Sequence, residues 1–344
     1  MVTHLEQEIA SQPDIIAQVL DKELSRVVQI VTKLRTFSYA MIAARGTSDH
    51  AATYATYIWP VLTGYPVALA TPSLYTLYGA PPRLNDALVI GVSQSGQSPD
   101  VYSVVEEGRR QKRPTLAITN DANSPLAQAA DEVIELHAGE ERSVAATKTY
   151  TAQLTIMALL AAAWSGQQQY LDDLQRLPDM LARTLADTDA IASRAERYSF
   201  MDQCVVIGRG YNYATAFEVA LKIKELTYVL THAYSSADFR HGPIATVSEG
   251  SAAMLIMPRG VAFDDMLNLV HELKQRGAEL LIISDDEQTK DYATTWLPIG
   301  PDVPEWISPL VSIVPGQIFA LHLAKAKGFD PDQPRGLNKV TRTF

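Results

Sequence analysis

Cysteine is nearly absent from this chain. Its 344 residues include one cysteine, Cys204, which lies in the apolar run CVVIG and is expected to be a small buried strand residue. No internal disulfide can form. The N-terminus shows no basic region followed by an apolar stretch, and the longest apolar run, residues 155–164, is too short to cross a bilayer. We therefore expect a cytoplasmic protein with no membrane partner.

Positively charged residues are fewer than negatively charged ones. Lys and Arg number 29 against 39 Asp and Glu, which gives a formal net charge of -10. This balance argues against nucleic-acid binding, which needs a basic face. Apolar residues make up 47% and charged residues 20%, as in a folded globular protein. The length is sufficient for two ordinary domains.

The sequence lacks the common nucleotide and metal motifs. No Gly-Lys-Ser/Thr loop of the Walker A type and no G-x-G-x-x-G pattern are present. The histidines show no metal-ligand spacing. We expect neither a metal nor a nucleotide cofactor.

Two halves of the sequence repeat in the same order. An apolar strand leads through Arg45-Gly46 into a helical stretch, and another leads through Arg209-Gly210, at an offset of 209 − 45 = 164. The same offset relates Asp121 to Asp285, each at the end of an apolar run. Short β-rich runs that alternate with helical stretches predict βαβ units and a parallel sheet. The sequence therefore predicts an α/β protein with two tandem, doubly wound, flavodoxin-like domains.

The repeat also suggests domain boundaries. We expect a helical N-terminal arm over residues 1–35, a first domain over 36–170, a helical linker over 171–198, a second domain over 199–330 and a C-terminal tail over 331–344. Ligands of open parallel sheets bind beyond the carboxyl ends of the strands. A site is therefore expected in the loops that follow the strands.

The stretch GVSQSGQSPD places many small uncharged donors at one turn after an apolar strand. Ser98-Pro99-Asp100 has the pattern of a helix start, so the turn lies at a helix N-terminus, which favours anions. Gly96 lets the backbone approach a ligand closely. The available side-chain donors are Ser93, Gln94, Ser95 and Ser98. A phosphate site and a serine-rich turn that caps its own helix both fit this pattern.

Two further features favour the phosphate site. The segment Gly46-Thr47-Ser48-Asp49 again opens a helix after a strand, and residues 143–149 bring small residues and hydroxyls ahead of another helix. The equivalent turn of the second half, residues 257–260, reads MPRG and has no serine. This asymmetry indicates that the polar turn serves a ligand rather than the fold.

The second half carries a charged stripe on a helix predicted over residues 215–230. Glu218, Lys222 and Glu225 fall within roughly 60° of one another at 100° per residue. Glu218 and Lys222 suit a structural ion pair, whereas Glu225 is left as a carboxylate that could move a proton. His241 precedes Gly-Pro in a turn and suits acid/base chemistry, although a lone loop histidine is often a bystander. Lys339, near the C-terminus, would by default be solvated.

The motifs ARGTS, SQSGQS, VAATK, ALKIKE, HGP and DQPRGLNK, in this order, resemble the tandem sugar isomerase (SIS) family over about residues 35–344. The pattern is similar to the isomerase half of glutamine–fructose-6-phosphate aminotransferase and to the SIS-type glucosamine-6-phosphate deaminases. The resemblance implies a homodimer that takes a hexose 6-phosphate or an amino-sugar 6-phosphate and needs no metal or nucleotide.

The resemblance also implies residue roles. Glu225 would move a proton between C1 and C2 with support from Lys222. His241 would assist ring opening from across the dimer interface, and Lys339 would form an imine with the open-chain keto sugar. The phosphate would be bound by Thr47, Ser48, Ser93, Gln94, Ser95 and Ser98, and the sugar would be lined by Val144 and Ala145.

This sequence departs from the aminotransferase pattern at several positions, and these departures favour a deaminase. Ala146 stands where the aminotransferases have serine, and Ala237-Asp238 replaces Gly-Glu. No glutaminase domain is recognised, so we expect that this chain does not hydrolyse glutamine by itself. The expected reaction converts glucosamine 6-phosphate to fructose 6-phosphate and ammonia. The alternatives are a glutaminase-less fructose-6-phosphate aminotransferase, a fructosamine-phosphate deglycase, and a non-catalytic sugar-phosphate-binding regulator.

Overall fold

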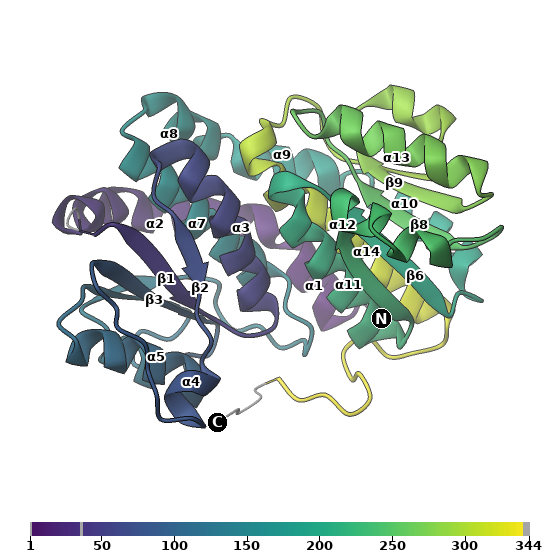
Figure 1. Cartoon of the computed structure of the whole chain (residues 1–344). Coiled ribbons are helices and arrows are strands. Elements are labelled where there is room, and N and C mark those ends of the chain that lie inside the picture. Colours follow the sequence, from purple (N-terminus) through teal and green to yellow (C-terminus); the bar gives the residue numbers. More distant parts are fainter. Residues whose placement is uncertain (1, 35–36, 340–344) are drawn as a thin grey trace. The chain divides into compact units, whose positions relative to one another are not determined.

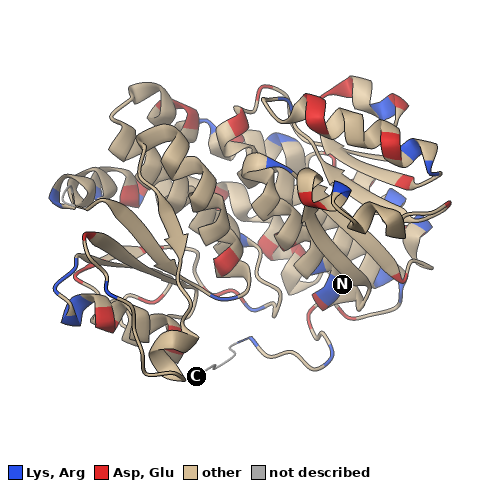
Figure 2. Ribbon diagram, viewed as in Figure 1, with Lys and Arg blue, Asp and Glu red and all other residues tan. Residues whose placement is uncertain are grey.

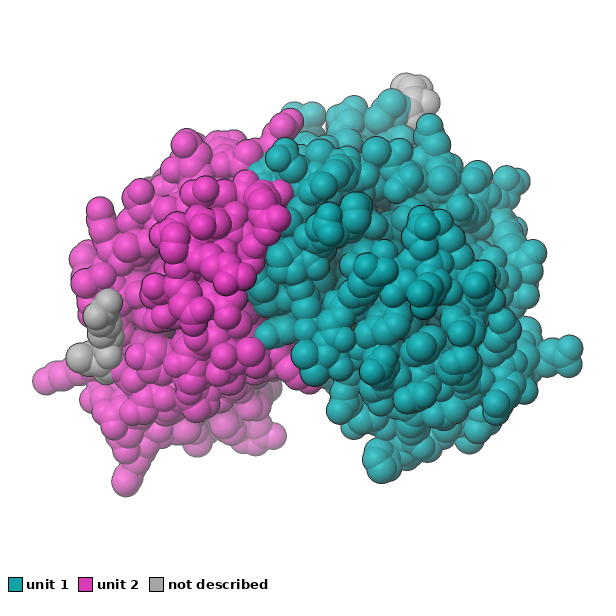
Figure 3. Space-filling view, turned by 90° about the horizontal axis from the view of Figure 1, so that it is seen from above, with its two compact units in different colours: residues 1–13, 142–147, 178–337 teal, residues 14–141, 148–177, 338–344 magenta. Residues whose placement is uncertain are grey.

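The computed structural model describes residues 2–34 and 37–339 (Figure 1). The boundary expected between residues 35 and 36, and residues 340–344 of the expected tail, lie outside the described residues. The chain forms two compact units (Figure 3). Unit 1 comprises residues 1–13, 142–147 and 178–337, and unit 2 comprises residues 14–141, 148–177 and 338–344.

Unit 2 is built on a five-stranded parallel sheet of order β2-β1-β3-β4-β5. Its strands are β1 (Tyr39–Ala43), β2 (Val67–Leu69), β3 (Ala87–Ser93), β4 (Thr115–Thr119) and β5 (Glu132–Glu135). All seven residues of the central strand β3 are buried. A strand covered on both faces requires such a continuous apolar run.

Unit 1 contains a second five-stranded parallel sheet, of order β10-β9-β8-β6-β7. Its strands are β6 (Gln203–Gly208), β7 (Leu230–Ser235), β8 (Ala252–Ile256), β9 (Glu279–Ser284) and β10 (Thr295–Pro298). The strand order is that of unit 2, and the first residues of β1 and β6 differ by 203 − 39 = 164. The predicted pair of doubly wound α/β domains related by an internal repeat is confirmed.

Helices cover both faces of each sheet. The α-helices are α1 (His4–Ala10), α2 (Gln12–Lys33), α3 (Thr47–Thr63), α4 (Ser73–Thr76), α5 (Pro99–Arg110), α6 (Pro125–Ala129), α7 (Lys148–Ser165), α8 (Gln168–Gln175), α9 (Leu177–Leu185), α10 (Thr188–Ala195), α11 (Tyr213–Thr227), α12 (Ser236–Arg240), α13 (Phe263–Gln275) and α14 (Ser308–Ala326). Short 3₁₀ turns are η1 (Glu196–Tyr198), η2 (Gly210–Asn212), η3 (Pro243–Thr246), η4 (Glu287–Asp291) and η5 (Glu305–Ile307).

The cores explain this layering. In unit 2, α5 and α6 pack on one face of the sheet through a cluster that includes Val101, Val104 and Leu126. Helices α3 and α7 pack together, and the indole of Trp59 donates a hydrogen bond to the carbonyl of Met157, at 3.0 Å. In unit 1, α12 packs against β7 and β6, α13 packs against β9, and α11 packs on α14.

Burial and charge agree with this arrangement. Charged residues lie mainly on helices and loops, and few occur on the strands (Figure 2). Within the described residues, the segment Glu305–Ala326 is long and apolar enough to cross a membrane. Of its most apolar 18-residue window, 94% is buried inside the fold, as in a core helix.

The helix predicted over residues 215–230 is shorter at its C-terminal end than expected. Helix α11 ends at Thr227, and Tyr228 adopts a left-handed conformation with φ +60°. That conformation cannot continue a right-handed helix, and β7 begins two residues later at Leu230. The charged stripe predicted on this helix lies within the observed α11.

Candidate active site

The polar turns of unit 2 follow two adjacent strands. Strands β1 and β3 are parallel neighbours in register at Ala43 and Gly91, and β2 lies on the other side of β1. The strand order therefore reverses between β1 and β3, which is where ligands bind in sheets of this order. Arg45-Gly46-Thr47 follows β1, and the turn Ser93–Ser98 follows β3.

The turn after β3 is folded tightly on itself. The backbone N–H of Gly96 donates to the carbonyl and hydroxyl oxygens of Ser93, at 3.2 and 3.1 Å. Gly96 has φ +62°, and a Cβ atom there would lie 2.1 Å from Oγ of Ser124. The N–H of Gln97 donates to the hydroxyl of Ser95, at 3.3 Å. Only glycine fits this close, left-handed position.

Ser98 allows a comparison of the two alternatives for this turn, which are a phosphate site and a serine-rich turn that caps its own helix. It is the N-cap residue of α5, yet its side chain makes no capping hydrogen bond. In contrast, Ser124 caps α6 and Ser235 caps α12 through their hydroxyl oxygens. The turn is therefore not simply a serine cap, and the half-buried Ser98 hydroxyl lies beside a helix N-terminus that favours an anion.

The turn after β1 adds a second helix N-terminus and a cation. Ser48 is buried, and its hydroxyl accepts a hydrogen bond from the Gln153 amide, at 3.0 Å. Nε of Arg45 lies 2.5 Å from Oδ2 of Asp100, near the start of α5, and joins the two turns. Burial raises the pKa of Asp49 in the first turn of α3, against the opposing charges of His50 and Arg45. Sequence analysis used Arg45 only as a marker of the repeat.

The loop that precedes α7 contains Val144 and Ala145. Ala145 is fully buried and Val144 is half-buried. Both belong to unit 1, where the buried carboxylate of Glu8 on α1 accepts the backbone N–H groups of Arg142, at 2.5 Å, and Ser143, at 3.3 Å. The N-terminal arm thus holds the loop that the resemblance assigns to the sugar.

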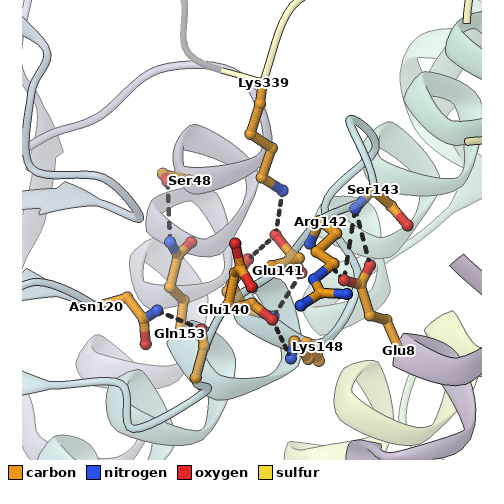
Figure 4. A network of polar contacts seen from close by, with 12 residues as sticks. Glu8, Ser48, Asn120, Glu140, Glu141, Arg142, Ser143, Lys148, Gln153 and Lys339 are labelled. Atoms are coloured by element: carbon orange, nitrogen blue, oxygen red, sulfur yellow. Dashed lines mark hydrogen bonds and ion pairs between the residues drawn. The ribbon is translucent and has the colours of Figure 1, made fainter. Parts of the chain in front are cut away.

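Lys339 makes an ion pair rather than lying in solvent (Figure 4). Its Nζ lies 2.6 Å from Oε2 of Glu141, whose side chain is fully buried. Both residues belong to unit 2. Sequence analysis missed Glu141; the one available signal was an acidic pair, Glu140-Glu141, placed shortly before the helix that begins at Lys148.

The charged stripe of α11 forms a compact triad in unit 1. Nζ of the fully buried Lys222 lies 3.2 Å from Oε1 of Glu218 and 2.6 Å from Oε2 of Glu225. Burial disfavours the ammonium, but the charges of Glu218 and Glu225 outweigh it and raise the pKa of Lys222. Glu218 is fully buried, whereas 22% of the Glu225 side chain is exposed. The triad therefore presents Glu225 as its accessible carboxylate.

His241 lies at the C-terminal end of α12, and its side chain is exposed. Its backbone N–H donates to the carbonyl of Asp238, at 3.1 Å, and Gly242 follows with φ +140°. The structure thus places His241, Lys222, Glu225, Val144 and Ala145 in unit 1, and it places Lys339 and the two turns expected to bind phosphate in unit 2.

The equivalent turn of the second repeat is occupied by the protein's own carboxylates. The N–H of Arg259 donates to Oδ1 of Asp285, at 2.8 Å, and its guanidinium pairs with Asp286, at 3.0 Å. Glu305 lies against Gly260, where a Cβ atom would be 2.1 Å from the glutamate Cδ. Within the described residues, no group of three or more His, Cys, Asp or Glu is arranged to hold a metal ion.

Known proteins with similar sequences include an isomerizing glutamine–fructose-6-phosphate aminotransferase from Methanothermobacter thermautotrophicus. It is 36% identical over 338 residues, which cover 97% of this chain and 56% of the relative. A protein of the same name from Mycolicibacterium smegmatis is 34% identical over 357 residues. The chain spans about half the length of these curated relatives.

Solved structures give the same picture. The C-terminal domain of the Francisella tularensis glucosamine–fructose-6-phosphate aminotransferase matches with TM-score 0.88 and 26% identity, over 97% of this chain and 98% of that one. A Silicibacter pomeroyi protein assigned as a phosphosugar isomerase matches with TM-score 0.86 and 31% identity, over 96% and 100%. A Thermotoga maritima glucosamine-6-phosphate deaminase shares the fold, with TM-score 0.81 and 20% identity, over 99% and 100%.

The SIS domain model matches residues 34–163 and again residues 201–326. These two segments contain the two sheets of identical strand order. The chain belongs to the SIS domain family and carries two SIS domains of the phosphosugar-isomerase type.

Proposed function

We propose that this protein is a phosphosugar deaminase/isomerase that converts glucosamine 6-phosphate and water to fructose 6-phosphate and ammonia. The observation that carries the proposal is the α11 triad, in which a buried lysine holds a partly exposed glutamate, Glu225, at 2.6 Å. A carboxylate oriented in this way suits proton transfer between adjacent carbon atoms. It is the chemistry that the deaminase and the isomerising aminotransferase share.

In the proposed mechanism, His241 assists ring opening, and Glu225 removes the proton from C2 of the open-chain amino sugar. Return of that proton to C1 leaves an imine at C2, and addition of water to the imine gives the ketone and releases ammonia. Lys222 orients Glu225, while Glu218 supplies the buried counter-charge that keeps Lys222 in place. Each of these steps follows the general rules of acid/base catalysis.

The phosphate anchors the substrate in this proposal. Thr47, Ser48 and the Ser93–Ser98 turn lie at two helix N-termini on either side of the strand-order reversal. Arg45 lies at the same edge of the sheet, half-exposed and ion-paired with the buried Asp100. Binding energy from a remote phosphate can be used to align the reacting carbons. Val144 and Ala145 would contact the sugar. We further propose a cytoplasmic homodimer that binds neither nucleic acid nor membrane, with His241 reaching the partner's site.

A second candidate is an aminotransferase that forms the amino sugar with ammonia from a partner protein. The 36% identity to a glutamine–fructose-6-phosphate aminotransferase favours it. A fructosamine-phosphate deglycase would use the same proton transfer. A sugar-phosphate-binding regulator without catalysis would have no chemical need for the Lys222–Glu225 pair.

The test measures ammonia release from glucosamine 6-phosphate by the purified protein and by Glu225→Gln. We expect turnover by the wild type and a loss of about 10²- to 10⁴-fold in kcat for the variant. Glu249→Gln, an exposed glutamate in the same unit, is the control and should keep full activity. Turnover of only fructosamine phosphates would favour the deglycase, and synthesis only with an added glutaminase would favour the aminotransferase. Sugar-phosphate binding without any turnover would leave the regulator.

A further inference from the structure

We propose that Glu141 is a positioning residue for Lys339, and that it acts in sugar turnover only by holding the lysine amine at the N-terminal end of α7 (Figure 4). The inference rests on the proposed function, because it takes Lys339 to contact the open-chain sugar during turnover. It concerns a carboxylate that the other proposed roles leave unused.

Glu141 is held in place by contacts other than its ion pair with Lys339. Its fully buried side chain accepts the backbone N–H of Thr149 on Oε1, at 3.1 Å, and the Thr149 hydroxyl on Oε2, at 2.8 Å. Helix α7 begins at Lys148, so this N–H belongs to its first turn. The unpaired N–H groups of a first turn carry partial positive charge, which stabilises a carboxylate there. Two hydrogen bonds from Thr149 therefore hold the buried Glu141 carboxylate independently of the lysine.

Lys339 is bound to that carboxylate by a short contact. Its Nζ lies 2.6 Å from Oε2 of Glu141, and only 25% of the lysine side chain is exposed. Exposed ion pairs contribute little because water competes for both charges. Here the carboxylate is wholly buried, so the contact is a charge-assisted hydrogen bond with a defined geometry. The amine is thereby held at one place.

The tail that leads to Lys339 is also tied down. In unit 1, the carboxylate of Asp332 accepts the N–H groups of His4 and Leu5, at 2.8 and 2.9 Å. The N–H of Arg335 donates to the hydroxyl of Tyr228, at 2.6 Å, and its guanidinium stacks on that ring, 4.4 Å from the centroid. Arg335, the last of these held residues, precedes Lys339 by four positions in the sequence.

The test is a double-mutant cycle on ammonia release with Glu141→Gln, Lys339→Met and the double variant. We expect each single change to lower kcat about tenfold or more with KM nearly unchanged, as for an interaction made during turnover. The double variant should be no slower than Lys339→Met, because Glu141 acts through the lysine. Glu141→Asp should recover part of the loss. Glu140→Gln is the matched control, because it makes the same chemical change at the neighbouring carboxylate and leaves Glu141 in place, while the bond from Lys148 to the Glu140 backbone carbonyl is kept.

A second measurement is independent of turnover. Trypsin cleavage after Lys339, followed by mass spectrometry, should be several-fold faster in Glu141→Gln and unchanged in Glu140→Gln, because the ion pair shields the lysine. If Glu141→Gln fails to fold, Thr149→Val removes the hydroxyl anchor of Glu141 and should give the same pattern more weakly.

Additive losses in the double variant, full activity of Lys339→Met, or unchanged cleavage after Lys339 would each overturn the positioning role. Failure of the wild type to turn over any of the sugar phosphates would instead overturn the proposed function. The cleavage assay would then still report on the ion pair.

Discussion

Lys222 and Glu225 lie one turn apart on α11, with 2.6 Å between Nζ of the fully buried lysine and Oε2 of the partly exposed glutamate. The same ammonium contacts Glu218, which is fully buried one turn earlier in the helix. One buried cation thus serves two carboxylates with different surroundings. Glu218 depends on the lysine for burial, and Glu225 depends on it for orientation.

Replacement of Lys222 by Met should lower both stability and activity, and adding Glu218→Gln should separate the two effects. Loss of one partner leaves the buried Glu218 carboxylate without its counter-charge, which costs about 3–5 kcal/mol of unfolding free energy. Ammonia release should fall as well, because Glu225 loses its orienting contact. Urea denaturation and a kcat measurement test both effects. Adding Glu218→Gln should restore most of the stability but not kcat; recovery of kcat would contradict the orienting role of Lys222.

Gly96 should be essential to the phosphate turn. In Gly96→Ala the new Cβ would lie 2.1 Å from Oγ of Ser124, so the turn must shift. We expect KM for the sugar phosphate to rise about tenfold, which corresponds to about 1.4 kcal/mol of binding. Gly139→Ala is the matched control, because Gly139 has the same φ of +62° but open space around its Cβ direction. An equal effect of both substitutions on KM would show that backbone strain, not the turn's shape, is responsible.

Ser98→Ala should weaken binding without weakening the fold. Its hydroxyl does not cap α5, so the unfolding free energy should change by less than about 0.5 kcal/mol. Loss of one hydrogen bond to phosphate should raise the dissociation constant of the sugar phosphate about three- to tenfold. Ser235→Ala, which removes a true cap from α12, should show the opposite pattern, with a stability loss of about 1 kcal/mol. Titration calorimetry and urea denaturation distinguish the two.

His322 on α14 should make the fold sensitive to mild acid. Burial, followed by the charge of Lys325, lowers the pKa of His322 from 6.5, against weaker attraction by Glu6 and Asp189. The unfolded chain then binds this proton more readily than the folded chain, so stability is present above about pH 6.5 and falls as the pH drops below it. The urea midpoints at about pH 7.5 and about pH 5.5 should lie closer together in His322→Gln than in the wild type. His4→Gln, at an exposed position, should not change the difference.

The two sheets could be predicted from the sequence because their signals are local and repeated. Each strand is a short apolar run, and the 164-residue offset between Arg45 and Arg209 places the second set on the first. The α11 triad was also predictable, since Glu218, Lys222 and Glu225 share a helix face by spacing alone. The Ser93–Ser98 turn was visible as a cluster of donors after a strand, although its proposed role in phosphate binding stays a prediction.

The contacts around the loop and the tail could not be predicted in this way. Glu141 and Lys339 are 198 residues apart, and Glu8 and Arg142 are 134 residues apart. No periodic pattern connects such pairs, because the fold alone brings them together. A lysine in a polar segment near a chain end is normally expected to be solvated. The contact with the buried Glu141 makes Lys339 different, and the sequence does not show that contact.

The two compact units do not follow the order of the chain. Residues 142–147, which precede the last helix of the first repeat, belong to the unit built on the second sheet, and the chain from residue 338 belongs to the unit built on the first. Each compact unit therefore contains a segment that comes from the other half of the sequence. A truncation between the two repeats would leave each unit without one of its own segments, so the two halves are not interchangeable building blocks.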